Sequence, residues 1–343
     1  MKFLQSKPGQ SIDLFRMLAH QEDFTLSNPE SANIFINKLG EEFTKAKSNP
    51  IMIYGFRVQA MFEYVATSLG KCAIVKTEDS GALHTTDPDI NVPDLRILLV
   101  DGQEFFVEVK NFYQSSPFEE YRIRKAYMEG LQRYASLFKK DVKLAIYWSK
   151  WTLWTLVSFD RVKCEGGKCS LSFENALKFN EMAMLGDYHI GTLSPIKFRV
   201  VADPARPRAV NANGEVIFTI GGIELYCKDN RIAMPREQSI ALFLMLYGEW
   251  PSEAGEACIE NGEFISFDFV SQPEEMLPDQ GFDMIGSMSG MISRRFNTMT
   301  ASEGQVERLS PQTDISDLGI HIPHDYQGEV LHLWLLIQQP STG

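Results

Sequence analysis

The segment from Val92 to Lys110 constrains the fold of this chain more than any other stretch. It contains two runs rich in Val, Ile, Leu and Phe, separated by Asp101-Gly102, and this pattern predicts a β-hairpin. Side chains alternate along a strand, so Glu108 and Lys110 should project from one face of the second strand. A buried charge is costly unless it is paired or binds a metal, so charges in so apolar a strand require an explanation.

The length of the hairpin loop decides whether Asp94 joins this charged pair. A two-residue loop would place Glu108 opposite Leu95. A three-residue loop with Gly102 as a left-handed bulge would instead place Glu108 opposite Asp94. A slip of one residue moves every side chain of a strand to the opposite face. We predict the bulged loop, because only that register gathers Asp94, Glu108 and Lys110.

The same residues resemble the signature of the PD-(D/E)xK nuclease superfamily. Pro93-Asp94 is followed, after thirteen intervening residues, by Glu108-Val109-Lys110. The resemblance extends more loosely over the flanking elements from about Met52 to Tyr147. It implies an α/β fold, with a restriction-endonuclease-like α/β/α core and a mixed sheet, and metal-dependent hydrolysis of phosphodiester bonds.

Two carboxylates that converge at a strand end offer the oxygen ligands that Mg²⁺ prefers, and we expect Mn²⁺ to substitute for it. Asp94 and Glu108 would bind the metal, with the backbone carbonyl of Val109 as a further ligand. Lys110 would orient the attacking water or stabilise charge in the transition state. The alternative is a salt-bridged hairpin, in which both carboxylates only neutralise Lys110 on a solvated face.

Two helices and a strand are predicted before the hairpin, over residues 29–47, 54–69 and 71–77, with Gly70 ending the second helix. Glu63 lies in the second helix, off its apolar stripe. Several branches of the superfamily place a metal-binding Glu in this helix, so the resemblance makes Glu63 a possible fourth ligand. An ordinary solvated Glu is the alternative.

A basic helix is predicted after the hairpin, from about Glu119 to Lys139, and a strand over 142–148. We interpret its basic face as a nucleic-acid-binding surface, with a solvated helix face as the alternative. The candidate residues are Arg122, Arg124, Lys125 and Arg133. Gln132 resembles a helix glutamine of some nuclease branches, but Ser136 stands where those branches have a tyrosine.

Two other groups of residues allow a functional and a structural interpretation. Tyr147, Trp148, Trp151 and Trp154 could stack on bases, but we expect core packing. The chain has five cysteines, scattered and odd in number, which fits a reducing cytoplasm. We therefore expect Cys164 and Cys169, on either side of Gly166-Gly167, to be free thiols.

Charge divides the 343 residues unevenly. Residues 1–170 contain 22 Lys and Arg against 21 Asp and Glu, a net charge of +1, whereas residues 171–343 contain 11 against 24, a net charge of −13. Phosphate binding therefore belongs to the first half. We expect a nuclease domain over residues 1–200 and an acidic α+β domain over 201–343, with an accessory, regulatory or dimerisation role.

These features together predict a cytoplasmic, magnesium-dependent endonuclease acting on DNA in restriction, defence or repair. Cleavage of two strands would require two active sites, so a homodimer is expected. No apolar run approaches the length of a membrane span, so we expect no membrane partner. The alternatives are a catalytically silent protein that binds nucleic acid or a protein partner, and a ribonuclease of the same fold.

Overall fold

The computed structural model describes residues 10–19, 25–79, 83–116, 118–275, 280–313, 318–323 and 325–341. The chain divides into two compact units, one of residues 1–186, 292–318 and 339–343 and the other of residues 187–291 and 319–338. The expected boundary lay near residue 200. Residues 292–318, which the sequence assigned to the second domain, group with the first unit.

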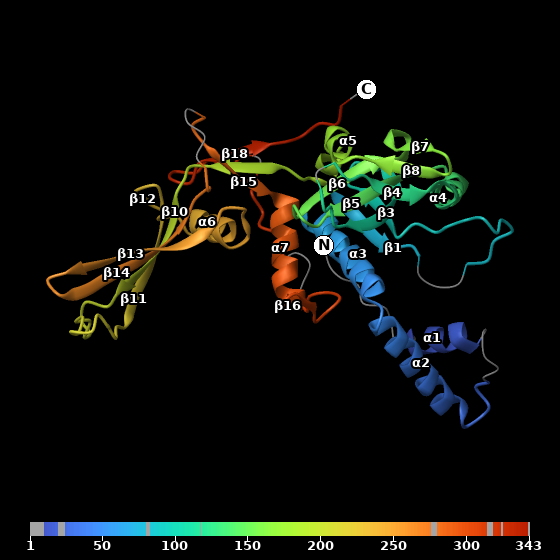
Figure 1. Ribbon diagram of the computed structural model, residues 1–343, viewed down its shortest axis with the longest axis horizontal. Coiled ribbons are helices and arrows are strands. Elements are labelled where there is room, and N and C mark those ends of the chain that lie inside the picture. Colours follow the sequence, from blue (N-terminus) through green and yellow to red (C-terminus); the bar gives the residue numbers. More distant parts are fainter. Residues whose placement is uncertain are drawn as a thin grey trace. The chain divides into compact units, whose positions relative to one another are not determined.

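A five-stranded mixed sheet forms the centre of the first unit (Figure 1). Its strands, in spatial order, are β1 (Cys72–Thr77), β2 (Leu95–Leu99), β3 (Glu104–Phe112), β5 (Asp141–Trp148) and β6 (Leu153–Ser158). β3 and β5 are parallel, and the other neighbours are antiparallel. Parallel neighbours need a crossover, which here contains α4 (Lys125–Leu137). The fold is therefore mixed α/β, as expected.

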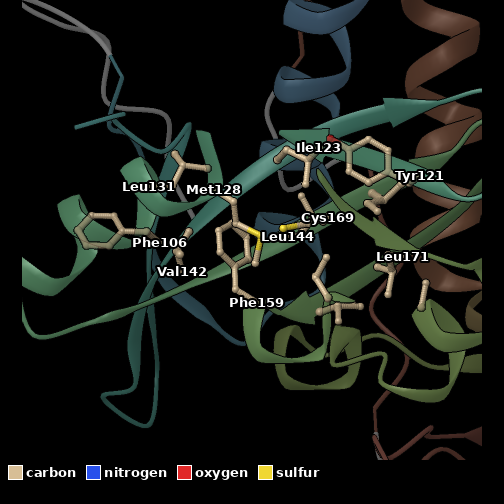
Figure 2. Close-up of a cluster of buried hydrophobic side chains, with 14 of the residues drawn as sticks. Phe106, Tyr121, Ile123, Met128, Leu131, Val142, Leu144, Phe159, Cys169 and Leu171 are labelled. Carbon is tan, nitrogen blue, oxygen red and sulfur yellow. The ribbon is translucent and has the colours of Figure 1, made fainter. Parts of the chain in front are cut away.

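Helices cover both faces of this sheet. On one face, Phe62 of α3 (Pro50–Ser68) packs against Trp154 of β6, with ring centroids 4.9 Å apart. The Trp154 indole donates to the hydroxyl of Ser293 in α7 (Met288–Thr300) at 2.9 Å. On the opposite face, Phe106 of β3 contacts Tyr134 of α4 at 5.3 Å between centroids, within the apolar cluster that Figure 2 shows. The sheet is therefore the middle layer of three.

The hairpin has the predicted register. Leu95 pairs with Val107, and the Leu99 amide donates to the Gln103 carbonyl at 2.8 Å. Gly102 has φ +90°, a left-handed conformation that suits glycine at the bulge. Continuing the ladder beyond Leu95 brings Asp94 opposite Glu108, so the prediction on which the site depends is confirmed.

The predicted helix over 119–139 is wrong in its first part. Residues 121–124 form β4 (Tyr121–Arg124), which pairs with β8 (Lys168–Leu171), itself paired with β7 (Lys163–Glu165). Along β4, buried and exposed residues alternate, because Tyr121 and Ile123 enter the core while Arg122 and Arg124 face solvent. This period of two belongs to a strand, although Ile123 also has the helical spacing to Tyr127 and Leu131 that suggested a longer helix.

The structure supports core packing for most of the aromatic cluster but contradicts the expectation for the two cysteines. Tyr147, Trp148 and Trp154 are buried, as expected for core residues, whereas Trp151 is 44% exposed. The expectation of two free thiols is wrong, because Cys164 and Cys169 form a disulfide. Their strands, β7 and β8, place them directly opposite each other.

Other elements complete the first unit. Its remaining helices are α1 (Gln10–Ala19), α2 (Ser31–Lys47), α5 (Phe173–Lys178) and the 3₁₀ turns η1 (Phe159–Arg161) and η2 (Met182–Leu185), and its remaining strands are β16 (Ala301–Ser302) and β17 (Gln305–Val306). Asn49 caps α3, since its side chain accepts from the Met52 amide at 3.3 Å, and Pro50 suits the first turn.

The second unit is α+β. Its larger sheet has the order β12 (Asn230–Arg231), β11 (Ile220–Cys227), β10 (Ile196–Ala202), β14 (Glu263–Ser271) and β13 (Ser252–Glu260). Its smaller sheet has the order β15 (Asp283–Ser287), β9 (His189–Thr192) and β18 (Leu333–Leu336). The unit also contains α6 (Pro235–Tyr247) and the first residues of α7. Residues 215–219 have no strand structure, and β11 of the larger sheet begins at Ile220. In the described part of the chain, no helix has the length and apolarity to cross a membrane.

Replacing Gly102 tests the bulged loop. Gly102→Ala should lower the free energy of unfolding by about 1–2 kcal/mol, because alanine is strained in the left-handed region. Gly102→Asn should lose less, since asparagine tolerates that conformation. Urea denaturation of the three proteins measures both effects. An alanine variant as stable as the parent would contradict this account of the loop.

Candidate functional site

The candidate site lies where β2 begins and β3 ends. Asp94 immediately precedes β2, and its Oδ2 accepts from the backbone N–H of Val109 at 2.6 Å. The N–H and C=O of one residue in a strand point to the same side, so the Val109 carbonyl also points toward Asp94. The Asp94 carboxylate thus continues the β2–β3 ladder by one hydrogen bond and is held beside Glu108.

Glu108 is a fully buried carboxylate, with 0% of the residue exposed. Its Oε1 accepts from the Tyr127 hydroxyl at 2.7 Å and from the Lys110 ammonium. Its Oε2 is also buried, yet it has no hydrogen-bond partner among the residues that the structure describes. Buried polar atoms are nearly always satisfied, so an orphaned carboxylate oxygen indicates a ligand.

Lys110 is the accessible member of the group. Its side chain is 30% exposed, whereas that of its partner Glu108 is 0% exposed. The ammonium also lies 5.6 Å from the ring centroid of Tyr127. Lys110 is thus held on the protein side by Glu108 and Tyr127 while its outer side can meet a ligand.

Burial changes the electrostatics of Asp94. Removal from water, together with the nearby negative charge of Glu108, raises its pKa to about 7. Lys110 and the Val109 amide act in the opposite direction but do not cancel these effects. At neutral pH the site can therefore exchange a proton for a cation.

Glu63 occupies a neighbouring position on α3. Its Oε1 accepts from the Thr77 hydroxyl of β1 at 3.3 Å, and burial raises its pKa to about 7. Asp79, just after β1, adds to this increase. Glu63 is thus a half-buried carboxyl on α3 that interacts with Thr77 of β1 and with Asp79, just after β1.

The donor set fits a hard divalent cation. Among the described residues, no group of three or more His, Cys, Asp or Glu side chains is arranged to hold a metal ion. Two side chains and one backbone group are available instead: Asp94, Glu108 with its unpartnered Oε2, and the Val109 carbonyl. Mg²⁺ keeps several waters and needs only one or two carboxylates, so such a partial set suits it.

The predicted basic surface is divided. Arg122 and Arg124 lie on the exposed side of β4, not on a helix. Lys125, the first residue of α4, pairs with Glu129 at 3.7 Å. Arg133 donates to the Asp89 carbonyl at 2.7 Å and so anchors the loop before β2.

Gln132 is exposed on α4 and lines a hollow together with Lys140 and Asp160. The residues that line this hollow do not include Asp94, Glu108 or Lys110. The structure therefore does not bring Gln132 into contact with the candidate ligands.

A cavity of about 590 Å³ opens beside the carboxylates. Its lining includes Asp94, Val109 and Lys110 from the hairpin, Asp79, and residues 50–52, 54–56 and 59 of α3. Gln59 of α3 donates to Asp79 at 3.5 Å. The site is therefore not closed, and a ligand in this cavity can reach Asp94 and Lys110.

Two residues of the site were missed in the sequence. Tyr127 has the spacing of the apolar face of the predicted helix, and nothing in the sequence indicates that its hydroxyl contacts a carboxylate. Asp79 lies in an acidic loop whose approach to the site depends on where β1 ends. Both positions follow from tertiary contacts, so spacing in the sequence could not identify them.

Comparisons with known proteins give little help. No family model matches the chain, and no curated protein matches it significantly. Among solved structures, Hjc, a Holliday junction resolvase of the archaeal hyperthermophile Archaeoglobus fulgidus, aligns with 13% identity and a TM-score of 0.22. The alignment covers 27% of this chain and 77% of the resolvase. So low a similarity carries no weight for function, which must be inferred from the residues of the site.

Metal affinity should depend on pH through Asp94. Its carboxyl must lose a proton to bind a cation, and its pKa is about 7. Between pH 6 and pH 8 the ionised fraction of such a group rises roughly tenfold, so Mn²⁺ should bind about tenfold more tightly at pH 8. Isothermal titration calorimetry measures this change. Asp94→Asn should bind weakly at both values; undiminished pH dependence in that variant would assign the effect to another group.

Tyr127 should position Glu108 for binding. Tyr127→Phe removes the hydrogen bond to Oε1, and loss of such an outer contact typically lowers metal affinity about 10–100-fold. Tyr134→Phe is the matched control, because this hydroxyl of the same helix donates to Glu78 at the same 2.7 Å. Calorimetric titration with Mn²⁺ compares them. Equal affinity in both variants would show that the Tyr127 hydroxyl does not orient the carboxylate.

Proposed function

We propose that this chain is a metal-dependent nuclease that hydrolyses phosphodiester bonds of DNA, with the restriction-endonuclease-like core that its resemblance to the PD-(D/E)xK superfamily implies. The observation that supports this most is the buried Glu108, with one oxygen held by Tyr127 and Lys110 and the other without a partner among the described residues. A solvated salt bridge, the alternative interpretation, would not bury the carboxylate completely.

The proposed ligands are Asp94, Glu108 and the Val109 carbonyl, with Glu63 as a further candidate. A bound Mg²⁺ would supply Lewis-acid polarisation of the phosphate and a more acidic water. Asp94 and Glu108 supply negative charge at one point of an otherwise apolar sheet end, which favours a cation there. Tyr127 restricts Glu108 to one rotamer by holding Oε1.

Lys110 is the proposed catalytic cation. Its ammonium is fixed by Glu108 and partly exposed, so it can donate to a phosphate oxygen or to the attacking water in the cavity. Charge that builds on the phosphate in the transition state would be stabilised by this preorganised donor. The exposed Arg122 and Arg124 of β4 are proposed to contact phosphates farther from the scissile bond.

The second unit has a different proposed role. Residues 187–291 and 319–338 contain 7 Lys and Arg against 18 Asp and Glu, a net charge of −11, which opposes the binding of a polyanion. We propose that this unit regulates the nuclease or mediates association. DNA is the proposed substrate by resemblance, and RNA is the alternative.

Cleavage of plasmid DNA in the presence of Mg²⁺ tests the proposal. Lys110→Ala and Glu108→Gln should each lower the rate at least about 100-fold, since both remove a group that acts in the transition state. Chelation with EDTA should abolish activity, and a parallel RNA substrate tests the alternative. Gel electrophoresis over time measures the rates.

Glu104→Gln is the matched control for Glu108→Gln. Glu104 lies on the same strand and the same face, and its partners are Arg96 and Lys140, away from the site. This variant should cleave like the parent. Binding of DNA without cleavage, with several metals and substrates, would instead favour a catalytically silent binding protein on this fold.

A further inference from the structure

The cavity beside the candidate site has two chemically different walls. The hairpin side contributes Lys110, Asn111 and Asp94. The α3 side is largely apolar, and its large side chains are exposed to an unusual degree: Ile51 is 85%, Phe56 53%, Met52 43% and Tyr54 39% exposed. A cavity with an apolar wall facing charged groups suits a ligand that has both a ring and a phosphate.

Gly55 lies in the middle of that apolar wall. Glycine destabilises a helix interior relative to alanine, so its presence in α3 requires a reason. Packing supplies none, because a Cβ built at Gly55 would have no described atom outside its own helix within 4 Å. Gly55 lines the cavity, and helix geometry places it between Tyr54 and Phe56, so no side chain fills the space that separates these two rings.

The charge of the cavity argues against a duplex as its occupant. Its charged lining residues are Asp79, Asp94 and Lys110, which is fewer positive than negative groups. Binding of duplex DNA depends on neutralising many phosphates. Single strands gain additional binding energy from stacking of their bases on aromatic rings, a contact that the paired bases of a duplex do not offer to the protein.

We propose that Phe56 and Tyr54 form a stacking wall for an unpaired base, and that Gly55 leaves the space in which that base lies. This inference rests on the proposed nuclease function and names its substrate class: DNA with unpaired nucleotides at the scissile position. The cavity of about 590 Å³ has the size of a small-molecule site and can take a single nucleotide. The base lies on the α3 wall while its phosphate faces Lys110 and the carboxylates.

Fluorescence anisotropy with labelled oligothymidylate tests the wall without requiring cleavage. The measurements use the full chain carrying Glu108→Gln, in Mg²⁺, and compare the single strand with a duplex of equal length. The single strand should bind more tightly. Adding Phe56→Ala should weaken its binding about tenfold, the usual effect of losing one base–aromatic stack. A strand of abasic sugar phosphates should bind the protein with intact Phe56 about as weakly as oligothymidylate binds the Phe56→Ala variant.

Gly55→Ala should change the stability of the protein and its binding of a single strand in opposite directions. It should raise the melting temperature, because alanine favours the helix, while weakening single-strand binding severalfold. Gly40→Ala and Phe43→Ala, on α2, are the matched controls, since Gly40 also has free space around a built Cβ and Phe43 is 65% exposed outside the cavity. Neither should change binding.

The outcomes distinguish this inference from the nuclease proposal. Equal binding of normal and abasic strands, or unchanged binding after both Phe56→Ala and Gly55→Ala, overturns the stacking wall even if the parent cleaves DNA. Base-dependent binding that is lost in these variants supports the wall even if no substrate is cleaved, and only the nuclease proposal then fails.

Discussion

Complete burial of the Glu108 carboxylate is the constraint on which the site depends. A charged group in this position is tolerated only if its oxygens are satisfied. Two elements contribute to that requirement, because β3 places Lys110 two residues away and α4 supplies the Tyr127 hydroxyl. The Asp94 carboxylate before β2 adds repulsion instead, and Glu108 Oε2 has no partner among the described residues, so both features make the site receptive to a cation.

The hairpin was predictable because its determinants are local. Asp101-Gly102 specified the turn, and the alternation of apolar and charged residues fixed which side chains share a face. Gly102 in the left-handed region then decided between two registers that differ by one residue. The mixed sheet, in contrast, was expected from the family resemblance, and the cap at Asn49 makes α3 begin at Pro50, four residues before its predicted start.

The parts that escaped prediction depend on contacts between distant segments. Ile123 continues the helical spacing of α4 in sequence, but pairing of β4 with β8 makes Tyr121 and Ile123 alternate residues of a strand. The same pairing moved Arg122 and Arg124 off the helix. Of the aromatic residues considered for stacking, Tyr147, Trp148 and Trp154 are in the core, whereas the aromatic residues that line the cavity belong to α3, whose apolar pattern resembled an ordinary packing face.

The three-residue turn also limits how the number of residues between Asp94 and Glu108 can vary. Asp94 and Glu108 are separated by thirteen residues, an odd number because equal lengths of strand flank a loop of three. A single insertion within one strand would rotate one carboxylate to the other side of the sheet. Lengthening both arms equally would keep them opposite each other. The number of residues between the two carboxylates should therefore change only in steps of two among functional variants of this hairpin. The site requires that this number stays odd, whatever the length of the strands.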